Sequence, residues 1–423
     1  MIIFMKHFVQ EKYDNPLLII LAYVGFCISV IAYSPYVIGM EYAYDAVAAE
    51  VRGLSFFSMI FFVIVGVLKI SDVSASIFSF SINIVFILSS MISLLLLLVN
   101  YDYAIYDDFI LASMCFVLLI GTSVFFKEKH IKIAFIIYSI ISFVVGIQTI
   151  IAYGVSFDIS DVYLISHKNS ICVNWAVCAV GMVFFGLTGK KNVFSVIYFV
   201  VTALFLTLIL MARGRAAFVA AVLCIIYILL KIYMSVSPQK VMAYLFAGII
   251  LVSGLIFLMV HLGIDNFIMT SFLQGRDISD IDNISSGRVV MLYDNIEYII
   301  HNFLFGYAYS VVGNPVPSHM YVLRILVTFG LIGGLPFLVP YFVMMKCILS
   351  GLTAMHAQRK FYTWELGYYL AAIVYIVSAF EPAFPLAPKT VTSIVYFMLG
   401  VSIRGTVMQM TKAKKFGPAA SLK

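Results

Sequence analysis

Long hydrophobic stretches alternate with short polar ones along almost the whole chain. Many of these stretches reach about 18–20 residues, the length at which an α-helix crosses a bilayer, and none shows the alternation of a membrane β-strand. Backbone polar groups must be paired inside lipid, so such stretches fold as helices. The pattern predicts an all-α, polytopic membrane protein with twelve spans: Pro16–Gly39, Gly53–Ile70, Ile77–Val99, Phe109–Phe126, Ile131–Tyr153, Ile171–Thr188, Val193–Ala212, Ala216–Met234, Val241–Leu262, His319–Lys346, Trp364–Phe380 and Thr390–Ile403.

One polar stretch, residues 263–318, interrupts this pattern between the ninth and tenth predicted spans. A loop of this length in a compact fold is typically functional or disordered. Apolar residues in Val289–Tyr293, at Ile296 and in Tyr298–Ile300 recur with helical spacing, which predicts an amphipathic helix lying on a membrane face. We therefore predict one transmembrane domain, residues 1–423, with a large periplasmic loop that carries the function.

Composition supports this prediction. The chain is 63% hydrophobic and 11% charged, whereas soluble domains carry about 25% charged residues. The first hydrophobic stretch, Pro16–Gly39, is longer than the core of a signal peptide, which predicts a retained anchor. The six cysteines lack metal-ligand spacing, so we interpret them as small hydrophobic residues.

The basic residues predict the orientation. With the N-terminus in the cytoplasm, 18 of the 26 Lys and Arg residues fall on the inner side and eight on the outer side, as the positive-inside rule requires. This distribution predicts an inner-membrane protein with both termini in the cytoplasm. Membrane topology also accounts for the net charge of +6, which therefore does not indicate nucleic-acid binding.

Five of the outer cations gather near span ends, and they are Lys168, Arg213, Arg215, Arg276 and Arg288. Cations kept on the outer face against the charge bias indicate a bound anion. Phosphate is the natural candidate because a guanidinium group binds it through two hydrogen bonds. Other readings stay open: the arginines around Gly214 can extend to lipid headgroups, and Arg288 can pair with Asp280 or Asp282.

Two further residues are candidates for acid–base chemistry. His319 follows the Asn314–Pro317 turn, where the chain re-enters the membrane, and a histidine there can act as a base or hydrogen-bond partner. Glu381 lies at the end of the eleventh predicted span as a second acid or base, or simply as a helix-end acid. Pro336 and Pro340 predict a kink in the tenth span.

The sequence shows no Gly-rich phosphate loop, no paired Asp motif and no metal-ligand cluster. We therefore expect no metal and no nucleotide cofactor, because a metal-dependent nucleotide-sugar enzyme normally carries paired carboxylates. The charge of a departing phosphate group would then be neutralised by arginine.

Several short motifs, in this order, resemble the superfamily of Wzy-type O-antigen polymerases and O-antigen ligases. Met211–Ala217 is similar to the S/A-R-G signature that opens a span, and the other matching motifs are His167–Asn169, Ser286–Arg288, Phe303–Gly306, Ser318–Tyr321 and Gly330–Gly333. The resemblance covers about Ile151 to Pro340. One position departs from the family, because the common H-N pair reads His319–Met320 here.

The resemblance implies a membrane glycosyltransferase that transfers a growing glycan from undecaprenyl pyrophosphate to a lipid-linked repeat unit at the periplasmic face. It implies that Arg213, Arg215 and Arg288, with Arg276 and Lys168 nearby, hold the pyrophosphate and that His319 positions or deprotonates the acceptor hydroxyl. A chain-length regulator protein is an expected partner beside the lipid-linked donor and the bilayer. An O-antigen ligase, with lipid A core as acceptor, and a flippase for the lipid-linked oligosaccharide remain the alternatives.

Overall fold

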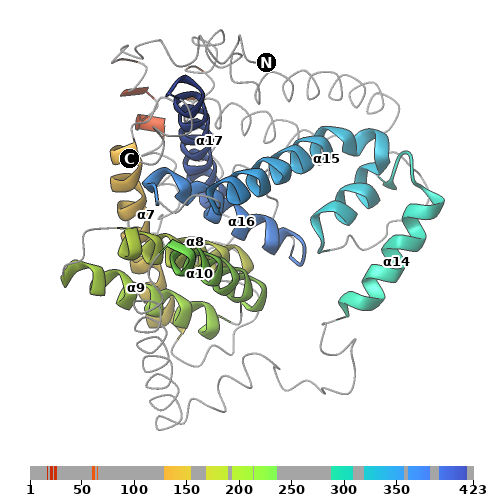
Figure 1. Ribbon diagram of the computed structural model, residues 1–423. Helices are drawn as coiled ribbons and strands as arrows, with labels where there is room; N and C mark the ends of the chain where they lie inside the picture. The colour runs from red at the N-terminus through yellow and green to blue at the C-terminus, as the bar shows by residue number, and fades with distance from the viewer. Residues whose placement is uncertain are drawn as a thin grey trace.

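The structure is a computed structural model that describes residues 17, 20, 21, 23–25, 60, 61, 64, 128–153, 168–188, 193–212, 214–235, 287–307, 319–356, 361–381 and 390–416. These residues form helices and turns and contain no β-strand, so the all-α prediction is confirmed for them. Figure 1 shows α8, α9 and α10 in one group, α15, α16 and α17 in a second group above it, and α14 to one side.

The longer helices agree with the predicted spans in position. In chain order they are α7 (Glu128–Tyr153), α8 (Lys168–Thr188), α9 (Val193–Met211), α10 (Arg215–Ser235), α14 (Arg288–His301), α15 (Tyr321–His356), the 3-10 turn η3 (Thr363–Glu365), α16 (Leu366–Ser378) and α17 (Thr390–Phe416). Three of them contain a stretch long and apolar enough to cross a membrane: Ile171–Thr188, Arg215–Ile232 and Phe337–Met355. The first four predicted spans, apart from single positions, and Val241–Leu262 lie outside the described residues.

Helix α8 is enclosed by its neighbours along its whole length. A side chain at Gly181 would overlap the ring of Phe135 on α7, so the glycine permits the close approach of these helices. The Trp175 indole N–H donates to the Ser142 carbonyl (3.3 Å), and the Asn174 amide donates to the Ser142 hydroxyl (3.0 Å). Small residues and interhelical hydrogen bonds stabilise helix association in membranes, which makes α8 the centre of the described bundle.

Helix α10 runs parallel to α8 and antiparallel to α16. Gly214, immediately before α10, packs on Cys172 near the start of α8. Lys231, near the end of α10, pairs with Glu365, directly before α16. The start of α8, the start of α10 and the end of α16 therefore lie at the same end of the bundle.

The Lys231–Glu365 ion pair is completely buried. Lys231 Nζ lies 2.5 Å from Glu365 Oε2, and the two side chains are 1% and 0% exposed. The Lys231 ammonium also lies 4.5 Å from the centre of the Phe361 ring, and the Tyr362 backbone N–H donates to Glu365 Oε1 (3.2 Å). Both charges thus have several partners, as buried charges require.

We expect Lys231→Met to destabilise the protein by about 3–5 kcal/mol, because it leaves the Glu365 carboxylate buried without its counter-charge. The double variant Lys231→Met/Glu365→Met should recover most of this loss, since neither charge remains. Thermal unfolding of the detergent-purified protein measures both effects, and Lys346→Met, at an exposed position on α15, is the control. A double variant no more stable than the single one would contradict the electrostatic explanation.

Helix α15 is broken at Gly330, where the backbone has φ 65° and ψ −167°. The rings of Tyr321 and Tyr341 stack with centroids 4.9 Å apart, although a straight helix would separate these residues by about 30 Å. The chain therefore folds back between segment α15a (residues 321–329) and segment α15b (residues 331–356). The prediction of one continuous span over His319–Lys346 is wrong for this reason, and the break falls at the glycine instead of at Pro336 or Pro340.

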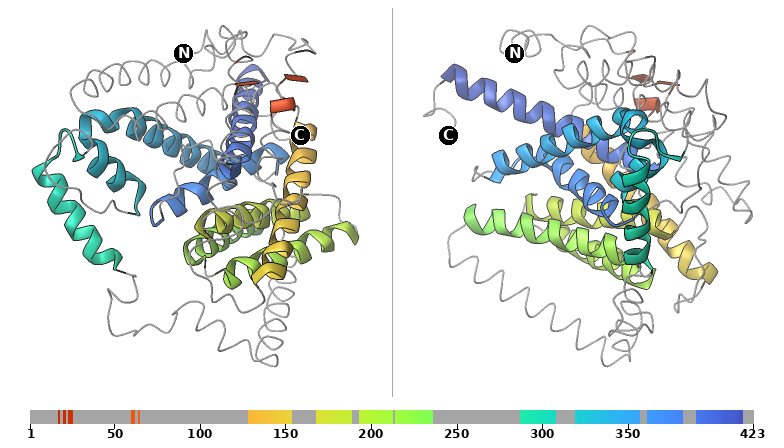
Figure 2. Two further views of the ribbon diagram at one scale, coloured as in Figure 1. Left: turned by 180° about the vertical axis from the view of Figure 1, so that it is seen from behind. Right: turned by 90° about the vertical axis from the view of Figure 1, so that its right-hand side faces the viewer.

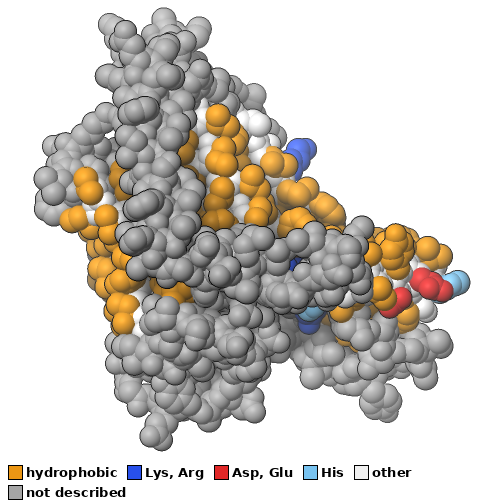
Figure 3. All heavy atoms as spheres, turned by 90° about the horizontal axis from the view of Figure 1, so that it is seen from below, with side chains coloured by type: hydrophobic (Ala, Val, Ile, Leu, Met, Phe, Trp, Pro, Cys, Tyr) orange, Lys and Arg blue, Asp and Glu red, His pale blue; other side chains and the backbone are white. Residues whose placement is uncertain are grey.

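Helix α14 confirms the amphipathic helix expected inside the long loop. It lies beyond the ends of α10 and α16 and runs across their direction, which all three ribbon views show (Figures 1 and 2). Residues 263–286 and 308–318 of the predicted loop lie outside the described residues. The part of the described surface that is visible in Figure 3 is largely apolar, as expected for helices that face lipid.

Candidate functional site

Four described helices begin at one end of the bundle, which we call the arginine end and define by Arg215, Arg288 and Glu381. Arg215 is the first residue of α10, and Arg288 is the first residue of α14. Glu381 follows the end of α16, where its N–H donates to the Val377 carbonyl (2.8 Å). Three candidate residues that are far apart in the sequence thereby come to the same end of the molecule.

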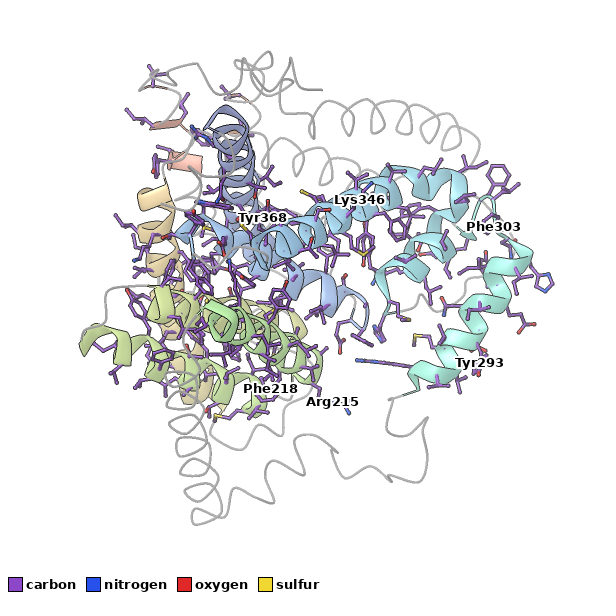
Figure 4. All side chains as sticks on the ribbon, in the orientation of Figure 1. Arg215, Phe218, Tyr293, Phe303, Lys346 and Tyr368 are labelled. Atoms are coloured by element: carbon purple, nitrogen blue, oxygen red, sulfur yellow. The ribbon has the colours of Figure 1, made fainter. Side chains whose placement is uncertain are left out.

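The turn between α9 and α10 is as short as the predicted spans Val193–Ala212 and Ala216–Met234 require, so the two helices form a hairpin with almost no loop. Helix α9 ends at Met211 and α10 begins at Arg215. A Cβ atom on Gly214 would overlap the Cys172 side chain, so the glycine is needed for packing against α8. Figure 4 shows Arg215, the first residue of α10, extending from the helix on the side of the bundle where α14 lies. The arginine is only partly buried there.

Arg288 and Glu381 form an ion pair, with 2.7 Å between Arg288 Nη2 and Glu381 Oε1. The Glu381 side chain is 9% exposed and that of Arg288 is 34% exposed. This bond uses one of the five N–H donors of the guanidinium group, so the exposed part of Arg288 can still bind an anion. The acidic partners expected for Arg288, Asp280 and Asp282, lie outside the described residues.

His319 lies directly before α15 and is half-buried. Tyr321, two residues later, stacks on Tyr341 of α15b, and Tyr341 stacks on Tyr375 of α16 with centroids 4.8 Å apart. The Tyr341 and Ser378 hydroxyl oxygens are 3.4 Å apart. This stack of tyrosines holds the start of α15 against the last turns of α16, and thus on the side of α16 that leads into Glu381.

The turn after α14 is inserted at the break in α15. The Leu331 N–H donates to the Phe303 carbonyl (2.7 Å), and the Ile332 N–H donates to the Leu304 carbonyl (3.1 Å). The first N–H groups of a helix have no hydrogen-bond acceptor inside that helix. The carbonyl groups of the turn therefore accept the hydrogen bonds of the first N–H groups of α15b. A Cβ atom on Gly330 would overlap the backbone of this turn. Two of the sequence motifs, Phe303–Gly306 and Gly330–Gly333, therefore pack directly against each other through their backbones. We call this contact between the turn after α14 and the break in α15 the joint.

The arginine end is suited to a negatively charged ligand. Helices α8, α10, α14 and α15a all begin there, and each helix N-terminus carries a partial positive charge of about half an elementary unit. Of the residues that define this end, Arg215 and Arg288 add full positive charges, and the Glu381 carboxylate is paired with Arg288. Exposed backbone N–H groups and guanidinium groups together bind phosphate.

The predicted site residues fall into two sets. The structure brings Arg215, Arg288, His319 and Glu381 to the arginine end, and α8 begins there with Lys168. Arg213 and Arg276 lie outside the described residues. Their predicted contacts with an anion remain predictions.

Sequence reasoning missed two features of the described structure. Lys231 and Glu365 lie inside two predicted spans and were not singled out, although a charged residue inside a predicted span is a signal of a buried partner. Sequence reasoning also placed Gly330 inside one continuous span, with a kink expected only at Pro336 or Pro340. The positive φ of this glycine and its fit to the turn after α14 depend on contacts that no local pattern contains.

Among the described residues, no group of three or more His, Cys, Asp or Glu side chains is placed to hold a metal ion. The described part of the chain is thus an all-helical protein with candidate membrane spans and a cationic end. Compared with protein-family models and with curated proteins, the sequence matches none of them.

Proposed function

We propose that the protein is a polysaccharide polymerase of the Wzy type in the bacterial inner membrane. It crosses the membrane twelve times, keeps both termini in the cytoplasm and has the arginine end at the periplasmic face. The 18-to-8 distribution of basic residues supports this orientation. The apolar helices α8, α10 and α15 support the membrane location.

The proposed reaction transfers a growing glycan to a hydroxyl group of a lipid-linked repeat unit. A bond forms between the hydroxyl oxygen and the anomeric carbon of the glycan, while the bond from that carbon to undecaprenyl pyrophosphate breaks. The electron pair of the broken bond leaves with the pyrophosphate, and the hydroxyl proton passes to a base. The protein therefore has to stabilise an anionic leaving group and accept one proton.

The residues of the arginine end have the chemistry for both tasks. Arg215 and Arg288, with Arg213, Arg276 and Lys168, bind the pyrophosphate and stabilise its growing charge. His319 accepts the proton of the acceptor hydroxyl. Glu381 orients Arg288 through the 2.7 Å ion pair and is the second candidate for the base.

The observation that carries this proposal is the meeting of Arg215, the Arg288–Glu381 pair and the starts of four helices at one end of an apolar bundle. Cationic side chains gathered at one end of an apolar bundle favour an anionic ligand at the membrane surface. A lipid-linked pyrophosphate fits this description, because its charged group sits at the membrane surface.

Incubation of the purified protein with lipid-linked repeat units tests the proposal directly. We expect polymer to form with a metal chelator present and without any nucleotide. Transfer only to an added lipid A core would instead identify a ligase. Movement of the intact lipid-linked unit across vesicles, without transfer, would identify a transporter.

We expect Arg215→Lys to lower the polymerisation rate by about 10²-fold, because lysine keeps the charge but cannot form the paired hydrogen bonds of a guanidinium group with phosphate. Arg404→Lys is the matched control. It makes the same change on α17, beside Gly405, which packs on Trp364 next to the Lys231–Glu365 pair at the opposite end of the bundle. A fully active Arg215→Lys variant would favour the alternative that Arg215 only contacts lipid headgroups.

A further inference from the structure

Helix α14 presents three different sides to its surroundings. Its protein side consists of side chains that are buried or half-buried, and they are Met291, Leu292, Asn295, Tyr298 and Ile299. Asn295 is 1% exposed, and its side-chain amide donates to the Met291 carbonyl (2.6 Å). Burial, with a smaller contribution from Tyr307, raises the pKa of Tyr298 above its usual value, so this side of the helix carries no charge at neutral pH.

The outward surface of α14 divides into two sectors. The apolar sector contains Tyr293, Ile296 and Ile300, which are 68%, 40% and 70% exposed. The polar sector contains the exposed residues Asp294, Glu297 and His301, with Val290 among them. At about 100° per residue, each trio covers roughly 60° and their centres are about 100° apart around the helix. In Figure 3 acidic and histidine side chains lie beside hydrophobic ones at the right-hand end, where α14 is.

The apolar sector continues into the turn that follows the helix. Phe303, Leu304 and Phe305 are 45%, 50% and 41% exposed, although their backbone is fixed at the break in α15. Six large apolar side chains in one continuous segment are thus exposed in the folded chain. A contiguous apolar surface of this kind marks a contact with a partner or with a membrane.

The position of α14 favours the membrane as that partner. The helix begins at the Arg288–Glu381 pair, directly after the apolar helix α16, and so begins at the level where a span ends. It runs across the direction of α10 and α16 (Figures 1 and 2). Where α10 and α16 cross a bilayer, a helix with this orientation lies along its surface and can meet protein, hydrocarbon and water on its three sides.

We propose that α14 is an interfacial membrane helix. Tyr293, Ile296 and Ile300, together with the Phe303–Phe305 turn, insert into the hydrocarbon of the leaflet at the arginine end, while Asp294, Glu297 and His301 face water. The helix carries one arginine, one histidine and two acidic residues, so apolar contact binds it and anionic lipids are not selected. This inference does not depend on the transfer reaction. It also means that a lipid-tailed ligand can reach Arg288 without leaving the leaflet.

Spin labels on the full chain in phosphatidylcholine nanodiscs test the inference. Single cysteines at 293, 296 and 300, in a variant without the six native cysteines, should collide more with oxygen than with a water-soluble nickel chelate. Labels at 294, 297 and 301 should show the opposite preference, and they are the matched controls on the same helix. Chelate access at both sectors would overturn the proposal, and so would exclusion of both reagents from the apolar sector.

A photocrosslinking amino acid provides a second measurement that keeps every native cysteine. Benzoylphenylalanine at position 300 should form an adduct with the mass of one phospholipid after irradiation in the same nanodiscs. The same residue at position 297 should give little or none. Equal adduct formation at both positions, or none at position 300, would place the apolar sector away from the hydrocarbon and contradict the inference.

Discussion

Replacing His319 by alanine is expected to lower the rate of glycan transfer by about 10²–10⁴-fold, the usual contribution of a positioned general base. The imidazole lies at the start of α15, which the Tyr321–Tyr341–Tyr375 stack holds against α16 near Glu381. Donor binding should persist, because Arg215 and Arg288 are unchanged. The rate of polymer formation and the binding of lipid-linked donor by the purified variant give the two values.

His301→Ala is the matched control for this change. His301 is exposed at the end of α14, so removal of its imidazole should leave transfer unchanged. His319→Gln separates two roles, since glutamine can hold a hydroxyl group by a hydrogen bond but cannot take its proton. A near-normal rate in His319→Ala would mean that the base lies elsewhere, and Glu381 would then be the residue to test.

Gly330→Ala is expected to strongly destabilise the described structure. The backbone at Gly330, with φ 65° and ψ −167°, lies in a region that only glycine adopts without strain. An alanine Cβ would also overlap the backbone of Leu304 and Phe305, which cannot move aside as a side chain can. The turn after α14 should therefore separate from α15b. Helix α14 would then be anchored at its first residue, Arg288, and no longer through the turn that follows it. We therefore expect a lower thermal stability and a lower rate of glycan transfer.

Two comparisons show whether the joint or the backbone strain causes the loss. Gly287 has φ 73° and open space around its Cβ position, so Gly287→Ala introduces strain alone and should cost only about 1–2 kcal/mol. Gly306→Ala would meet the backbone of Thr328 and Gly330 from the other side of the joint and should behave like Gly330→Ala. Equal stability of all three variants would contradict the interlocking of the two segments.

The fold class and several helices could be predicted from hydrophobic length and periodicity. The amphipathic helix was predicted from residues between Val289 and Ile300, and α14 runs from Arg288 to His301. This works because burial of an apolar stripe in a helix depends on a local repeat of 3.6 residues. The hairpin at Gly214 was predictable for a similar reason, since two apolar stretches meet there with only a few residues between them.

The candidate site was predictable only as a set of residues. Charge bias identified Arg215 and Arg288, and position in the chain identified His319 and Glu381, yet no pattern shows that Arg288 pairs with Glu381, 93 residues away. That contact depends on the path of the chain between α14 and α16. Arg213 and Arg276 remain sequence predictions.

The amino-acid sequence by itself determined that this chain is helical, apolar and cationic at selected span ends, because each of these properties belongs to a residue and its near neighbours. Only the tertiary structure decided which ends meet. The antiparallel packing of α10 on α16, in which Lys231 pairs with Glu365, brings Arg215 to the end that holds Glu381. The tertiary structure also decides the fold-back at Gly330. The positive φ of this glycine interrupts the helix, and the N–H groups that follow it then need carbonyl acceptors from another segment, which the turn after α14 supplies.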